Sequence, residues 1–286
     1  MPAFGIPNPL LAGGFHPYDA AMTPDQYESS PALVCGFVGA GALTAAIVEG
    51  IEANAADFPA ILLSPRGRDV ARGLADRFAN VQVCDNNQDV LDSATTVVVA
   101  VRPQVGRAVL EELSFRPEHV VLSVMAGVQL EQLREWVAPA SQVVRIIPLP
   151  SAARGRALTT IYPDDPVARE LFGRVGDLLV PSSEASFEAL SAATATFAAH
   201  LDYLATIEGW LTDNGLGADA AAAYTTYIFG QLGETLSQQS DSLAELTEKH
   251  MTPGGTNEQF MTDLRRDGVP DSVRRALDRI LARLSG

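Results

Sequence analysis

Three closely spaced glycines, Gly36, Gly39 and Gly41, interrupt the apolar stretch VCGFVGAGALTAAI in the first fifth of the chain. The apolar residues before the last two glycines predict a buried strand, and those after them predict a helix. In this context a glycine turn lets the backbone approach a pyrophosphate, and the first N–H groups of the helix, here those of Ala42 and Leu43, bind it. The stretch therefore predicts a dinucleotide-binding turn, with a plain strand-to-helix turn as the alternative.

The second strand-like run holds the residues expected to choose between the two nicotinamide dinucleotides. An NAD-binding protein usually has a carboxylate about 20 residues beyond the glycine turn, where it binds the ribose hydroxyls. Here the run ends in LLSPRGR, which has two arginines and no carboxylate. Because arginine binds phosphate oxygens through two parallel N–H groups, we expect NADPH rather than NADH. Ser64 and Arg66 would bind its 2′-phosphate, and a solvated loop is the alternative.

Short β-branched runs alternate with helical patterns along the first half of the chain. Runs with little polar alternation are typical of strands buried on both faces, and their alternation with helices predicts right-handed crossovers in a parallel sheet. The expected fold class is therefore α/β, with a Rossmann-type doubly wound parallel sheet. The expected strands are LVCGFVG, AILLS, VQVC, TTVVVAV, HVVLSVMAG, QVVRIIP and ALTTIYP, and the expected helices cover about 43–54, 68–78, 105–113, 130–136 and 166–179.

The character of the sequence changes near residues 181–183, after which alanine-rich helical patterns continue without strand signals to about His250. We expect an irregular N-terminal arm at 1–32, an NADP-binding Rossmann domain at 33–182 and an all-helical domain at 183–286. A large apolar helical surface normally meets a partner. The helical domain is thus expected to bind substrate and to form a homodimer or a higher oligomer, with packing against the Rossmann domain as the alternative.

The composition disfavours several kinds of partner and of binding site. The chain has 286 residues, a formal net charge of -15 and a single lysine, Lys249. Such an acidic chain disfavours nucleic acid as a partner, and no apolar run approaches the ~20 residues of a membrane span. Its two cysteines and four histidines lack metal-ligand spacing, so neither a metal site nor a disulfide is expected. The first residues lack the pattern of a signal peptide, which predicts a cytoplasmic location.

Several blocks of the sequence resemble, in the same order, those of the pyrroline-5-carboxylate reductase family. They are GFVGAGALTAAI, VVVAVRPQ, VVLSVMAGVQLEQL, VVRIIPLPSAARGRALTTIYP and TPGGTNEQF, and the resemblance extends from Leu33 to Arg283. It implies an NAD(P)H-dependent reductase that transfers hydride to the C=N carbon of a cyclic imine, forming proline from pyrroline-5-carboxylate. It also implies a helical domain that interlocks with its partner, so that the catalytic cleft is completed across the dimer.

The resemblance assigns roles to residues beyond the glycine turn. The nicotinamide end of the cofactor pocket would be lined by Val101, Arg102, Pro103 and Gln104, and bordered by Ser123, Ala126 and Gly127. Thr256 would approach the substrate and the nicotinamide from the turn that contains Gly255, a substrate-binding candidate. The same turn has a local explanation, because Thr256 and Gln259 have the spacing of a capping box at a helix start.

The chain departs from the family pattern in two places. Where the family usually reads Met-Pro-Asn-Thr-Pro, residues 147–151 read IPLPS, so the hydrogen bonds of the asparagine are lost. The family's carboxylate-binding loop, Ser-Gly-Ser-Gly-Pro-Ala-Tyr, is here SAATATF at residues 191–197. Losing two glycines and a proline predicts regular helix in place of an anion-binding nest. The segment retains Ser191, Thr194 and Thr196 as substrate-binding candidates.

His200 stands three residues past that segment, where many family members place a hydroxyl group that donates to the imine nitrogen. On a helix it shares a face with Thr196 and Tyr203. A histidine at this place is able to protonate the nitrogen as hydride arrives. A packed or interfacial side chain is the alternative.

Three functions are consistent with these patterns. The first is an NADPH-dependent pyrroline-5-carboxylate reductase with a divergent substrate loop. The second is a reductase of a different imine or carbonyl substrate on the same scaffold, and the third is a non-catalytic NADP-binding regulatory protein. A β-hydroxyacid dehydrogenase is disfavoured, because its acid-base lysine belongs on the first helix of the helical domain and Lys249 does not lie there. The persistence of the Pro-Gly-Gly-Thr turn favours an enzyme.

Overall fold

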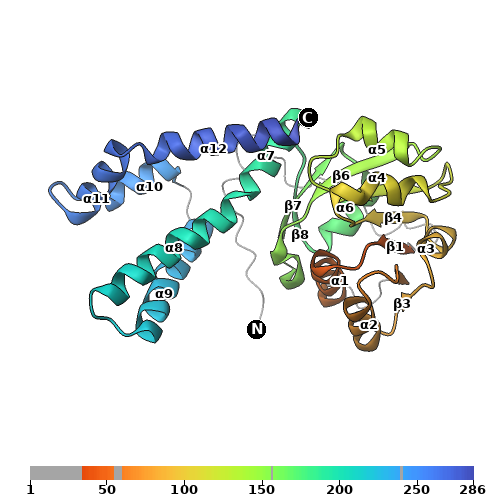
Figure 1. The fold of residues 1–286 in the computed structure, drawn as a ribbon, viewed down its shortest axis with the longest axis horizontal. Helices are drawn as coiled ribbons and strands as arrows, with labels where there is room; N and C mark the ends of the chain where they lie inside the picture. Colours follow the sequence, from red (N-terminus) through yellow and green to blue (C-terminus); the bar gives the residue numbers. More distant parts are fainter. Residues whose placement is uncertain (1–33, 55–59, 156, 239–240) are drawn as a thin grey trace, which may run out of the picture. The chain divides into compact units, whose positions relative to one another are not determined.

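The computed structural model describes residues 34–54, 60–155, 157–238 and 241–286 (Figure 1). The N-terminal arm expected at 1–32 lies outside the described residues. Contacts divide the chain into two compact units. We call the first, which reaches Thr194 and also includes residues 279–286, the sheet unit, and the second, Ala195–Asp278, the helical unit. The functional boundary expected at 182/183 stays a prediction.

The sheet unit is built on one mixed sheet, which has eight strands within the described residues, in the order β3-β2-β1-β4-β5-β6-β7-β8. Strands β1 to β6 pair in parallel, as the sequence predicts. The chain moves outward from β1 to β3 and then returns to β4 on the other side of β1. In sheets of this kind ligands bind at the reversal point, beyond the carboxyl ends of the strands. The strands are β1 (Cys35–Val38), β2 (Ile61–Leu63), β3 (Val81–Val83), β4 (Thr96–Val99), β5 (Val120–Ser123), β6 (Gln142–Ile147), β7 (Ala157–Tyr162) and β8 (Gly176–Leu179).

Helices cover both faces of this sheet (Figure 1). Alternate strand residues point to opposite faces, so Phe37 joins the core on one face and Val38 the core on the other. One face packs against α1 (Ala42–Asn54), α2 (Arg68–Arg77), the 3-10 helix η3 (Pro150–Arg154) and α6 (Pro166–Gly173). The other packs against α3 (Asn87–Ser93), α4 (Pro103–Glu111) and α5 (Leu130–Trp136). The expected burial on both faces is therefore confirmed for β1, β2, β4 and β5, whose residues are all buried, whereas the edge strand β3 buries only Val81.

The sheet continues where the sequence predicts a helix. The helix expected at 166–179 ends at Gly173, and β8 follows it. Strand β7 runs antiparallel to β6, and β8 pairs with β7 in parallel. The prediction was wrong here because pairing with the free edge of β7 outweighs the local helical pattern. The sheet is thus parallel over its first six strands only.

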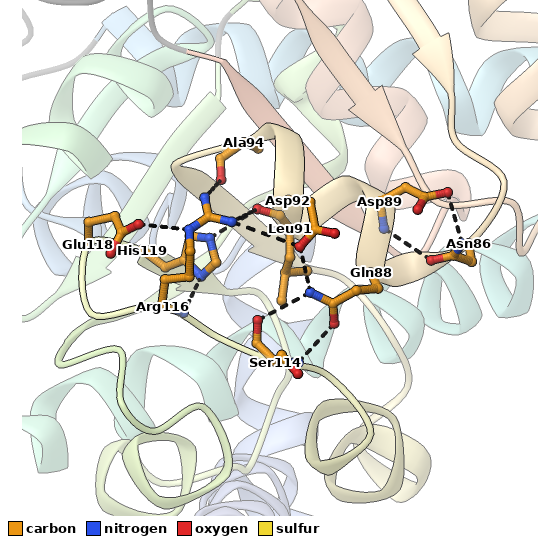
Figure 2. A network of polar contacts seen from close by, with 10 residues as sticks. All are labelled: Asn86, Gln88, Asp89, Leu91, Asp92, Ala94, Ser114, Arg116, Glu118 and His119. Carbon is orange, nitrogen blue, oxygen red and sulfur yellow. Dashed lines mark hydrogen bonds and ion pairs between the residues drawn. The ribbon is translucent and has the colours of Figure 1, made fainter.

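A polar network lies where the chain enters β4 and β5, at the edge opposite the carboxyl ends of the strands. It includes α3, a helix that our sequence interpretation did not predict (Figure 2). The buried side chain of His119 accepts a hydrogen bond from the Arg116 N–H at Nδ1 (2.9 Å), and its Nε2 lies 3.0 Å from the Leu91 carbonyl oxygen. Gln88 connects α3 to Ser114 through both ends of its amide. The network ties α3 to the loop before β5.

The helix α7 (Glu184–Thr194) belongs to the sheet unit, and the helical unit follows it. Within the helical unit α8 and α9 pack against each other. Among its described residues only Ala221, Thr225 and Leu246 are buried. The unit therefore leaves much apolar surface exposed, as the sequence predicts. Its helices are α8 (Thr196–Asp213), α9 (Ala218–Gln238), α10 (Leu243–His250), α11 (Thr256–Arg266) and most of α12 (Val269–Leu284).

Candidate active site

Two buried hydroxyl groups hold the glycine turn between β1 and α1. The N–H of Gly39 donates to Ser64 Oγ (2.8 Å), and the Gly39 carbonyl accepts from Thr44 Oγ1 (2.8 Å). Both side chains are completely buried. Thr44 occupies the third fingerprint position, where glycine or alanine is usual, and its hydroxyl closes the turn. The turn is therefore held in shape by side chains on both sides.

The turn packs tightly on one side and is open on the other. Gly39 has φ 105°, and a Cβ there would lie 2.6 Å from the Ala100 carbonyl oxygen at the end of β4. A Cβ on Gly41 would meet no heavy atom of the described residues within 4 Å. Gly41 and Ala42 are exposed at the start of α1, whose first turn has no acidic residue. An open turn at an uncompensated helix N-terminus fits a pyrophosphate.

The loop after β2 lies directly against this turn. A Cβ on Gly67 would lie 2.0 Å from the Ala40 carbonyl oxygen, so the two backbones are in close contact. Arg66, the neighbouring residue, is exposed. Ser64 differs from it, because its buried hydroxyl already binds Gly39. Of the two expected 2′-phosphate ligands, Arg66 is thus the accessible one, and a direct contact by either stays a prediction.

The other expected cofactor residues lie mostly at the same edge of the sheet. Gly36 is the exception, because it lies inside β1, where a Cβ would come within 2.5 Å of Val90 on α3. Its position indicates close helix packing. Ser123 is the buried last residue of β5. The rest follow the carboxyl ends of β4 and β5 and are at least partly exposed: Val101, Arg102, Pro103, Gln104, Ala126 and Gly127. The edge therefore brings the glycine turn and the expected nicotinamide residues together.

The divergent substrate segment is helical. Helix α7 ends at Thr194 and α8 begins at Thr196, and Ala195 between them keeps helical dihedrals (φ −65°, ψ −14°). The prediction of regular helix at 191–197 is confirmed. Ser191 is buried on α7, and its carbonyl accepts from Thr194 Oγ1 (2.7 Å). Substrate binding by Ser191, Thr194 and Thr196 stays a prediction.

His200 lies in an aromatic cluster of the helical unit. Its ring stacks on Tyr203 at a centroid distance of 6.3 Å and meets the edge of Phe229 at 6.4 Å. It lines a groove of about 430 Å³ between α8 and α9, together with Leu201 and Thr225. The residue is exposed. It therefore remains a candidate for contact with a substrate or with a second chain.

The Pro-Gly-Gly-Thr turn opens α11, but the capping box expected there is absent. Gly255 is the N-cap and has no side chain to accept a hydrogen bond from the first turn, and Thr256 is the first helical residue. Instead, the Gly254 N–H donates to Glu258 Oε2 (2.6 Å). The capping-box prediction was wrong by one position at the helix start. Thr256 is exposed, so the local explanation for its presence is weakened.

Sequence reasoning missed a buried charge cluster in the sheet unit. Arg145 on β6 is 1% exposed and forms ion pairs with Glu184 and Glu188 on α7, at 2.7 and 2.6 Å. The available signal was an arginine inside an apolar strand, followed by a helix with two glutamates four residues apart, which places them on one face. The cluster fixes α7 to the sheet.

The described part of the chain contains no group of three or more His, Cys, Asp or Glu side chains able to hold a metal ion. Cys35 and Cys84 are free thiols, and burial raises the pKa of the Cys35 thiol well above its usual range. Of the described helices, none combines the length and the apolar character needed to cross a membrane.

Comparison with known proteins yields two family models. Residues 34–127 match the model described as NADP oxidoreductase coenzyme F420-dependent, and residues 184–286 match the model described as pyrroline-5-carboxylate reductase dimerisation. The chain is 27% identical over 255 residues to pyrroline-5-carboxylate reductase of Pseudomonas aeruginosa, covering 85% of this chain and 92% of that protein. It is also 27% identical to pyrroline-5-carboxylate reductase 3 of Rattus norvegicus, covering 88% and 94%.

Solved structures show the same fold. The 1-pyrroline-5-carboxylate reductase of Streptococcus pyogenes superimposes with a TM-score of 0.77 at 22% identity, covering 90% of this chain and 99% of that one. The Plasmodium falciparum pyrroline carboxylate reductase, solved with NADP bound, superimposes with a TM-score of 0.73 at 15% identity, covering 88% and 97%. The expected Rossmann-type domain followed by an all-helical domain is therefore confirmed.

Proposed function

Because the chain belongs to the pyrroline-5-carboxylate reductase family, we propose that it reduces pyrroline-5-carboxylate to proline with NADPH. It is an NAD(P)H-dependent oxidoreductase that acts on a C=N bond. The observation that carries the proposal is the glycine turn, held by Ser64 and Thr44 and open beside the start of α1. The names of the relatives favour this substrate over other imines and over a non-catalytic role.

The proposed site residues would contact the cofactor at two places, the pyrophosphate and the nicotinamide. When bound, the reduced nicotinamide supplies a hydride to the imine carbon while the nitrogen gains a proton, which yields the amine and the oxidised cofactor. The turn at Gly39–Gly41 and the N–H groups of Ala42 and Leu43 hold the pyrophosphate. The loops after β4 and β5 hold the nicotinamide end. We assign the proton to His200 and the positioning of the imine to Thr256, both exposed in the helical unit.

The preference for NADPH depends on Arg66. Arg66 is exposed in the loop after β2, which packs on the glycine turn. This loop has no carboxylate. A charge-assisted hydrogen bond contributes about 1.5–3 kcal/mol, so Arg66→Ala should raise the KM for NADPH by about tenfold or more. The KM for NADH should hardly change. Arg72→Ala, at an exposed position one turn further along α2, serves as the control. Equal loss with both cofactors would contradict 2′-phosphate binding by Arg66.

The activity itself is tested with purified protein, by following NADPH and NADH oxidation with pyrroline-5-carboxylate. Pyrroline-2-carboxylate and an uncharged cyclic imine are run beside it, and NADPH binding is measured separately by fluorescence. Turnover of pyrroline-5-carboxylate with NADPH preferred supports the proposal. Turnover of another imine alone would refute pyrroline-5-carboxylate as the substrate. Failure to bind either cofactor would refute the proposal that the protein is an NAD(P)H-dependent reductase.

The oligomeric state of the protein is also part of the proposal. The dimerisation model over residues 184–286 supports self-association. We propose that the oligomer is a homodimer or a multiple of it, and that residues 183–286 act as the substrate and dimerisation domain. The cytoplasmic location stays a prediction from the sequence.

A further inference from the structure

The charge cluster around Arg145 reaches the loop that borders the expected nicotinamide site. The Gln129 side chain lies on that loop, between β5 and α5, and its Nε2 donates to Glu188 Oε1 (2.9 Å). The same Oε1 pairs with Arg145 Nη2. In addition, the Leu130 N–H donates to Glu184 Oε1 (2.8 Å). The loop is thus bound to α7 through both glutamates of the cluster.

The end of the chain is held at the same point. Gln129 Nε2 also donates to the carbonyl oxygen of Leu284 (2.7 Å), in the last turn of α12. The Leu284 side chain packs over Gly127, where a Cβ would lie 3.2 Å from Leu284 Cδ2. All these residues belong to the sheet unit. One amide therefore connects the β5–α5 loop, α7 and the C-terminal turn of α12.

The hydrogen bonds of Gln129 lie close in sequence to two candidate functional residues. Ala126, exposed at the end of β5, lies three residues before Gln129 in the same loop. Ser191, a substrate-binding candidate, lies three residues after Glu188 and therefore about one helical turn further along α7. Moving Gln129 would shift the loop relative to α7, and displacements of about 1 Å are enough to impair a reaction strongly.

We propose that Gln129 is a positioning residue that holds the Ala126 loop in the geometry needed to bind the nicotinamide end of the cofactor. The inference rests on the proposed function, because it assumes a nicotinamide cofactor at this edge of the sheet. It assigns Glu188 as the acceptor that orients the amide and Arg145 as the cation that keeps this acceptor in place. Glu188 and Arg145 act through Gln129 and are not proposed to touch the cofactor.

The test compares Gln129→Met with Gln88→Met. Methionine keeps the length of the side chain and removes both the amide donor and the side-chain oxygen, which accepts a backbone N–H at the start of α5. Gln88 is a matched control, because it is also half-buried and its amide also connects a helix to a loop, at the opposite edge of the sheet (Figure 2). We expect Gln129→Met to weaken NADPH binding on the order of tenfold, and Gln88→Met to leave it unchanged. The urea unfolding midpoints of both variants measure how much each substitution destabilises the fold.

A milder variant keeps the inference testable if Gln129→Met does not fold. Glu188→Gln retains an acceptor oxygen and leaves Arg145 paired with Glu184, so it should weaken NADPH binding by a smaller factor. Unchanged NADPH affinity in both variants, or an equal loss in Gln88→Met, would overturn the inference. NADPH affinity is measured by fluorescence without an imine. A wild-type protein that binds NADPH but does not reduce pyrroline-5-carboxylate would therefore refute the proposed substrate and leave this test valid.

Discussion

At the scale of single residues, the contact between Gly67 and Ala40 makes a sharp prediction. Gly67 has φ 83° and no room for a Cβ, which would lie 2.0 Å from a carbonyl oxygen. Gly67→Ala should therefore lower the free energy of unfolding by about 2 kcal/mol or more and push the Arg66 loop away from the turn. Urea unfolding and NADPH titration measure the two effects. The control is Gly73→Ala on the exposed face of α2, which should be neutral or slightly stabilising; equal losses would refute the prediction.

The residues of the glycine turn also show what a sequence reveals about a site. The turn itself was predictable, because strand, glycines and helix follow one another within a few residues. The bond from Gly39 to Ser64 was not, because it joins positions 25 residues apart. Ser64 was expected at the cofactor phosphate, which stays a prediction, and its hydroxyl also supports the turn. Gly36 belongs to the same glycine pattern but faces α3, a helix that was not predicted.

At the scale of elements, the network that joins α3 to the loop before β5 should make stability depend on pH. Burial, followed by the nearby Arg116, lowers the pKa of His119 below its usual value. Its Nδ1 accepts a hydrogen bond, so protonation would break that contact. The unfolded chain binds this proton more readily than the folded one. His119 therefore contributes stability that is complete above its unfolded pKa of about 6.5 and decreases as the pH falls below it.

This pH effect is measured by urea unfolding between about pH 7.5 and pH 5. His119→Gln removes the titrating group, so we expect a flatter dependence for the variant together with lower stability at neutral pH. His250→Gln is the control, since this exposed histidine lies outside the network and its Nδ1 contacts the Leu246 carbonyl of its own helix. Parallel pH curves for the wild type and His119→Gln would contradict the assignment.

The elements themselves differ in how far the sequence could define them. Helix α5 was predicted with its observed ends, because its apolar spacing and its flanking residues agree. Strand β8 was assigned to a helix, because its pairing with β7 depends on a partner that no local pattern reveals. The start of α11 was placed one residue too late, with Thr256 rather than Gly255 as the N-cap. Interactions that are distant along the chain account for the larger of these errors.

At the scale of the whole molecule, the helical unit leaves large apolar side chains exposed in the single chain. Leu201 on α8 and Tyr227 on α9 are 66% and 67% exposed. Burying such side chains is favourable by about 1.5–3 kcal/mol each, so charges at these positions should oppose self-association. We expect Leu201→Arg and Tyr227→Arg to shift the protein to monomers in size-exclusion chromatography with light scattering. Val83→Arg, an exposed apolar position on β3, should leave the assembly unchanged. Persistent oligomers in both variants would exclude the α8–α9 face as the contact.

The division into two units has a spectroscopic consequence. The chain contains two tryptophans, and each unit has one of them. Trp136 on α5 is half-buried against the core of the sheet unit, whereas Trp210 on α8 is 62% exposed. In a chain that does not self-associate, a dissolved quencher such as acrylamide should therefore remove the emission of Trp210 first. The remaining fluorescence, or that of a Trp210→Phe variant, reports on the sheet unit alone, so each unit has its own intrinsic optical probe without chemical labelling.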